Sequence, residues 1–151
     1  MTEEELLQKI HHAFQSVERP SRMTVADGDF ECMDKDRTLH SMRKGQVTLR
    51  EAFNPGYSIF TEILPEALVY FFEDFAKLAL LPHDGDEEWF GEHFMMFLDD
   101  RFRNKCNTSQ KEAVRAFLEF MQRRFWALIN WHLPYLNANA FKYWDLTLPE
   151  T

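Results

Sequence analysis

The stretch that decides the fold is TEILPEALVYFFEDFAKLALL, residues 61–81. Successive residues of an α-helix turn by about 100°, so its charged side chains fall within about a third of the circumference and leave the rest apolar. Those charged residues are Glu62, Glu66, Glu73, Asp74 and Lys77. Thr61 is a candidate cap, Pro65 suits the first turn, and Pro82 ends the pattern. So narrow a polar stripe predicts the central helix of a bundle.

Helical periodicity continues on both sides of this stretch. Thr2 and Glu5 form a capping-box pattern, which predicts a first helix that ends by Pro20. Ser109 and Glu112 form a second such pattern, which predicts a long helix running towards residue 132. The apolar residues of both segments recur at steps of three and four residues, so each helix is expected to bury one face.

Two shorter helices complete the expected bundle. One covers about residues 34–44 and ends before Gly45, and the other covers about 87–103 with Asp86 as its cap. The tail from residue 135 to 151 carries Phe141, Tyr143 and Trp144 and is expected to pack on the bundle. No alternating strand pattern of useful length occurs. The sequence therefore predicts one all-α domain over residues 1–151, a bundle of about five to six helices with a packed aromatic C-terminal tail.

Composition excludes several classes of protein. The 151 residues are 45% hydrophobic, with 25 acidic residues against 17 basic ones and a net charge of −8. This hydrophobic content exceeds that of disordered chains, and the negative charge makes nucleic acid an unexpected partner. The acidic N-terminus does not resemble a secretory signal, and charges interrupt the most apolar stretch, which argues against a membrane span. Together with only two distant cysteines, these features predict a cytoplasmic protein.

Motifs for catalysis, metals or cofactors are missing from the sequence. There is no HExxH, glycine-rich phosphate loop, GxSxG or Glu-x-x-His pattern. The acidic turn at Asp27 lacks the spacing of an EF-hand, and the adjacent His11 and His12 would point about 100° apart on a helix. Cys106 lies among basic residues that would lower the pKa of an exposed thiol. We therefore expect no metal, no cofactor and no catalytic residue.

Polar side chains on otherwise apolar helix faces form one candidate site. His93, Arg124 and His132 all fall among aromatic or apolar neighbours on their predicted helices. A buried arginine needs a partner, and Asp74 is a candidate for that role. These four residues predict either a buried polar cluster that lines a pocket or a satisfied structural pair with histidines at helix ends.

A run of acidic residues forms the second candidate site. Between residues 78 and 100 there are seven acids and no lysine or arginine. The expected partner-binding acidic face consists of Asp84, Asp86, Glu87, Glu88 and Glu92. Such a face would speed the association of a basic protein, whereas the plainer interpretation is a solvated helix face that complements the basic segment 101–124. An aromatic surface between residues 125 and 144 is a further candidate for a homodimer or partner interface.

Two stretches of the chain resemble a bacterial domain family. ILPEALVYFF (residues 63–72) and SQKEAVRAFLEF (109–120) resemble the central "PEA-x-x-YYLPAFL" helix and the later "Q-x-x-AVxxFLxxL" helix of a small bacterial helical family of unknown function. The chain has Phe72-Glu73-Asp74 where that family often has Leu-Pro, so the helix kink is expected to differ. The resemblance implies a helical fold and transfers no activity.

The leading functional prediction is a non-enzymatic helical module, of an immunity-like or regulatory kind, that binds an unknown and possibly basic protein. The alternative is a small enzyme or ligand-binding protein with a pocket around His93, Arg124 and His132.

Overall fold

The apolar stretch at the centre of the chain forms α4 (Pro65–Ala79), against which α1 (Glu3–Phe14), α5 (Phe90–Met96) and α6 (Asp100–Asn104) pack. The computed structural model describes residues 1–25, 30–54, 57–82, 89–132 and 139–148. The remaining main helices are α2 (Phe30–Ser41), α7 (Thr108–Arg124) and α8 (Trp126–His132). Short elements complete the described chain: α3 (Leu49–Ala52), β1 (Phe53–Asn54), β2 (Tyr57–Ser58), a 3-10 turn (Ile59–Thr61) and α9 (Asn139–Lys142). The predicted all-α class is confirmed.

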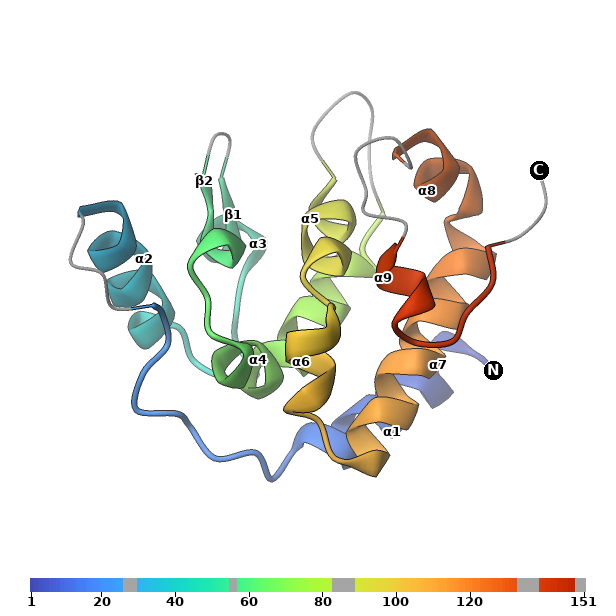
Figure 1. Cartoon of the computed structure of the whole chain (residues 1–151), viewed down its shortest axis with the longest axis horizontal. Coiled ribbons are helices and arrows are strands. Elements are labelled where there is room, and N and C mark those ends of the chain that lie inside the picture. The colour runs from blue at the N-terminus through green and yellow to red at the C-terminus, as the bar shows by residue number, and fades with distance from the viewer. Residues whose placement is uncertain (26–29, 55–56, 83–88, 133–138, 149–151) are drawn as a thin grey trace.

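Phe72 of α4 lies at the centre of the core. Its ring contacts Phe14 of α1, Phe94 of α5, Phe102 of α6 and Phe117 of α7, with ring centroids 4.6 to 5.8 Å apart. One side chain thus joins four helices to the central one. Figure 1 shows α7 along the right of the view with α1 crossing behind its lower part, and α1 packs on both α7 and α4.

The start of α4 agrees with the sequence in part. Pro65 occupies the first turn as expected, because its missing N–H leaves no hydrogen bond unmade there. Leu64, however, is the residue that precedes the helix, and Thr61 ends the 3-10 turn instead of capping α4. Glu73 and Asp74 are both buried, so the solvated stripe of α4 is narrower than predicted.

The capping predictions for α1 and α7 have different outcomes. The Thr2 hydroxyl accepts a hydrogen bond from the Glu5 backbone N–H at 3.1 Å, which confirms the first cap. The capping box of α7 is Asn107 with Gln110, two residues before the predicted pair. An asparagine cap satisfies the same free N–H groups as a serine cap, but it falls outside the Ser/Thr pattern of a capping box.

Two predicted helices are each broken into two. The expected helix 87–103 is α5 and α6, and Asp99 caps α6 by accepting from the Phe102 N–H at 3.1 Å. The expected helix 109–132 is α7 and α8, separated at Phe125, whose backbone (φ −118°, ψ 24°) is not helical. Phe94 before the break at residues 97–99 and Phe102 after it both contact Phe72.

The second helix lies earlier than predicted and ends at Ser41, before the turn at Gly45. Gly45 has a φ of +88°, a conformation that disfavours any residue with a Cβ. Its backbone N–H donates to the Asp74 carboxylate at 2.8 Å, which fixes this turn against α4.

The aromatic tail packs on the bundle, as the sequence predicted. Phe141 and Trp144 are buried, and the Trp144 indole N–H donates to the Leu98 carbonyl oxygen at 2.8 Å. Arg115 of α7 donates to the carbonyl oxygens of Trp144 and Asp145. The tail therefore closes over α6 and α7 in Figure 1.

Candidate functional site

The contacts of the described residues do not join the four residues of the predicted polar cluster, Asp74, His93, Arg124 and His132, to one another. Asp74 binds the backbone of Gly45, as described above. Arg124 lies at the last turn of α7, where its guanidinium forms a 2.8 Å ion pair with Glu3 of α1. The expected pairing of Arg124 with Asp74 is therefore wrong.

Arg124 is also not buried. Its side chain is 41% exposed, and its guanidinium lies over the rings of Phe120 and Phe125. Because it is the last residue of its helix, its long side chain reaches past the edge of the core while its methylene groups cover apolar surface. The sequence correctly placed Arg124 on the helix face that carries these aromatic residues, but the expectation that its side chain is buried was wrong.

The two histidines of this set lie on separate short helices. His93 of α5 is half-buried, and its ring centroid lies 4.9 Å from that of Phe53 in β1. His132 ends α8, and its side chain lies outside the described residues. A pocket that contains both histidines thus stays a prediction.

The predicted acidic face falls mostly outside the described part of the chain. Asp84, Asp86, Glu87 and Glu88 lie outside the described residues, and Glu92 is half-buried on α5. Of the predicted aromatic surface, Phe141 and Trp144 belong to the core, and the side chains of Trp131 and Tyr135 lie outside the described residues. Phe125, Trp126 and Tyr143 are half-buried, and a homodimer through them stays a prediction.

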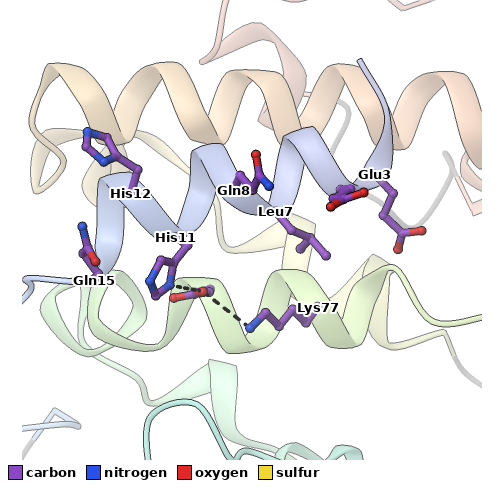
Figure 2. A pocket seen from close by; sticks show the side chains of 9 residues that line it. Glu3, Leu7, Gln8, His11, His12, Gln15 and Lys77 are labelled. Atoms are coloured by element: carbon purple, nitrogen blue, oxygen red, sulfur yellow. Dashed lines mark hydrogen bonds and ion pairs between the residues drawn. The ribbon is translucent and has the colours of Figure 1, made fainter.

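A different site lies in the groove between α1 and α4 (Figure 2), which has a volume of about 700 Å³. We call it the α1–α4 groove. His11 points across the gap to α4, whereas His12 points away from it. His11 Nδ1 lies 2.8 Å from Glu73 Oε1, and Lys77 Nζ lies 3.5 Å from the same oxygen. The groove is lined by Glu3, Glu4, Leu7, Gln8, His11, His12, Gln15, Glu73 and Lys77.

These contacts explain how α4 tolerates a buried carboxylate. The Glu73 side chain is only 10% exposed, and an unpaired carboxylate at that depth would be strongly unfavourable. The lysine one turn later on α4 and the histidine of α1 supply its partners. His11 itself stays 60% exposed, and its contact with Glu73 is not predictable from the sequence, because the periodicity of two helices does not determine the register between them.

Asp74 lies on the neighbouring side of α4, close to Lys44. Burial raises the pKa of the Asp74 carboxyl and Glu73 raises it further, while the Gly45 and Val47 amides and Lys77 oppose this shift. Burial likewise lowers the pKa of Lys44, which the carboxylates of Glu73 and Asp74 oppose. Lys44 Nζ donates to the Phe14 carbonyl oxygen at 2.7 Å and lies 4.9 Å from the centre of the Tyr70 ring.

The raised pKa of Asp74 predicts how stability depends on pH. The folded carboxyl holds its proton more tightly than the unfolded one, so its contribution is complete below the unfolded pKa of about 4 and is lost as the pH rises through the folded pKa. An amide cannot ionise but can still accept from Gly45. Relative to the native protein, Asp74→Asn should therefore gain unfolding free energy between pH 4 and 7, as measured by urea denaturation. Equal gains for the exposed Asp34→Asn would contradict this.

The Cys106 thiol lacks the exposed setting in which its basic neighbours would lower its pKa. Its side chain is buried, and this burial raises the pKa of the thiol to about 12, with Lys111 and Arg103 opposing the shift. The expected lowering by nearby basic residues applies to an exposed thiol only.

Because the thiolate is the reactive form, Cys106 of the folded protein should resist iodoacetamide at pH 8 and react readily in urea. Mass spectrometry of the Cys106 peptide measures both rates. Equal rates with and without urea would show that this thiol is accessible in the native state.

The titratable groups of the described residues form ion pairs and do not gather into a metal-binding cluster. Within the described ranges, no three His, Cys, Asp or Glu side chains are placed to hold a metal ion. The best-placed pair, His11 and Glu73, is already engaged with Lys77, as in a structural ion pair. Of the helices described, none has the length and apolar character needed to cross a membrane.

Comparisons with protein-family models, with curated proteins and with solved structures find no match to this chain. The resemblance to a bacterial helical family stays a prediction.

Proposed function

We propose that the protein is a non-enzymatic helical interaction module, of a regulatory or immunity-like kind, that binds a basic segment of another protein in the α1–α4 groove. The observation that carries this proposal is an open groove that has two carboxylates, Glu3 and Glu4, towards one end and one apolar side chain, Leu7, in its lining. The partner is the basic protein that the sequence analysis expects, and we propose that it binds α1 and α4 and not the acidic residues between 84 and 92.

The charge of the groove favours a basic ligand. Its lining holds three carboxylates (Glu3, Glu4 and Glu73) and one ammonium group (Lys77), a net charge of −2 with both histidines neutral. Glu3 is paired with Arg124, and Glu73 with His11 and Lys77. Glu4 is exposed and has no ion pair within the described part of the chain, so it is the carboxylate most available to a partner.

The shape of the groove favours a chain segment over a small substrate. Its volume of about 700 Å³ lies open along the surface of α1 rather than in an enclosed cavity. Leu7 is half-buried in its middle and offers an apolar contact between the acidic and amide side chains. Mixed apolar and charged rims of this kind are typical of protein interfaces, in which charge speeds association and selects the partner.

The alternative of an enzyme or ligand-binding protein with a pocket around His93, Arg124 and His132 has less support. Arg124 is exposed and held by Glu3, and Asp74 is held by the Gly45 turn. Among the described residues, the contacts of Arg124 and Asp74 therefore do not bring these two side chains together in that pocket.

The test is affinity capture from a lysate of the native host with three baits: the native protein, Glu4→Lys and Glu112→Lys. Glu112 is an exposed acid of α7 with no ion pair among the described residues, so its reversal changes the net charge equally at another place. We expect a basic protein that binds the native and Glu112→Lys baits, is lost as salt rises, and binds Glu4→Lys about tenfold less. Equal capture by the two variants would contradict the proposal.

A further inference from the structure

A second pocket lies between the segment 21–25 and α2, apart from the α1–α4 groove, with a volume of about 530 Å³. Arg22 lines it from the extended segment, and Met33, Asp36, Arg37 and His40 line it from α2. We call it the α2 pocket.

The walls of the α2 pocket are held by hydrogen bonds. The Val25 N–H donates to the Glu62 carbonyl oxygen at 3.1 Å, and the Leu64 N–H donates to the Met23 carbonyl oxygen at 2.8 Å. These bonds fix the extended segment beside the start of α4. The Thr24 hydroxyl then donates to Asp36 Oδ1 at 2.8 Å and so ties the segment to α2.

The two arginines that line the pocket have no partner among the residues that the structure describes. Arg22 and Arg37 make no hydrogen bond, ion pair or ring contact with any described residue. By contrast, Arg115 binds Glu119 and Arg124 binds Glu3. Two unpaired guanidinium groups that border one pocket from two fixed walls form an arrangement suited to an oxyanion, since each presents a planar fork of N–H donors.

The one acid that lines the pocket is already engaged. Asp36 accepts from Thr24, and its other oxygen lies 3.5 Å from His40 Nε2. With His40 neutral, the lining carries two guanidinium groups and one carboxylate, a net charge of +1. The pocket is thus a positive site on a protein whose net charge is −8.

An apolar strip continues from the arginines along α2. Phe30, Met33 and Arg37 are spaced three and four residues apart, so they share one face of the helix. Phe30 is 91% exposed and Met33 is 50% exposed, in a chain that buries most of its phenylalanines. Exposed apolar groups beside a cationic pocket fit a ligand with an apolar body and an anionic head.

We propose that the α2 pocket binds a small organic oxyanion, a phosphate or a carboxylate joined to an aromatic or aliphatic group. Arg22 and Arg37 hold the anionic head from opposite walls. Met33 and Phe30 contact the apolar body.

Titration with phenyl phosphate, phenylacetate and the uncharged benzyl alcohol, followed by two-dimensional amide NMR, tests this proposal. We expect saturable shifts from at least one of the two anions, confined to residues 21–25 and 30–40, and none from benzyl alcohol. The tighter anion identifies the head group as phosphate or carboxylate. Arg22→Gln and Arg37→Gln should each weaken binding about tenfold.

The matched controls are Arg43→Gln and Arg50→Gln, which remove exposed arginines outside the pocket and should leave the affinity unchanged. The spectra also report whether each variant is folded. Shifts that do not saturate, that spread over the surface, or that weaken equally in all four variants would overturn the assignment.

Discussion

Phe72→Ala is expected to lower the unfolding free energy by about 3–5 kcal/mol, the usual loss when a buried phenylalanine is truncated. The ring of Phe72 is fully buried and contacts one aromatic ring from each of α1, α5, α6 and α7. Its removal leaves a cavity where these helices meet. A helix that moved to fill this cavity would lose its contacts with the other helices. A loss of this size is a large fraction of the 5–15 kcal/mol typical of a domain.

Urea denaturation followed by far-ultraviolet circular dichroism measures this loss. The matched control is Phe30→Ala, which removes the same ring from a position that is 91% exposed and should change the stability by less than about 0.5 kcal/mol. Similar losses for the two variants would contradict the described core.

Trp144→Ala is expected to have a comparable effect of about 3–5 kcal/mol, although it lies near the end of the chain. The indole is 2% exposed, packs 6.0 Å from the Phe102 ring and lies beside the Arg103 guanidinium. Its N–H also satisfies the Leu98 carbonyl oxygen, which lies in the break between α5 and α6.

Trp144→Phe separates the two contributions of this side chain. It keeps most of the apolar contact and leaves the Leu98 carbonyl without its donor, so a loss of about 1–3 kcal/mol is expected. Tyr143→Ala, at a half-buried neighbour, should cost less than Trp144→Ala. If Trp144→Ala is as stable as the native protein by the same urea assay, the tail does not stabilise the bundle.

The sequence predicted those parts of the fold that depend on local pattern. The narrow charged stripe of residues 61–81 identified α4, and the aromatic residues of the tail indicated that it would be buried. The helix breaks at residues 97–99 and at Phe125 escaped prediction, because apolar spacing continues through both. The breaks depend on how aromatic rings from several helices pack in the core, which the sequence of one helix does not show.

The candidate sites were harder to predict for a related reason. Helical spacing placed Arg124 on an apolar face, but its position on the final turn lets it reach solvent and Glu3. His11 and Glu73 lie 62 residues apart on two helices, and nothing in either segment indicates that they meet. Arg22 and Arg37 were also missed, because one of them lies in an extended segment that periodicity does not describe.

The most direct test of the central proposal places a photo-crosslinking amino acid at Gln8 in the α1–α4 groove and, as a control, at the exposed Ser109 of α7. Both proteins are expressed in the native host and irradiated. We predict that Gln8 gives one crosslinked basic protein, that Ser109 does not, and that adding Glu4→Lys removes the product at Gln8. A product that forms equally at both positions, or that survives Glu4→Lys, would contradict binding in the groove.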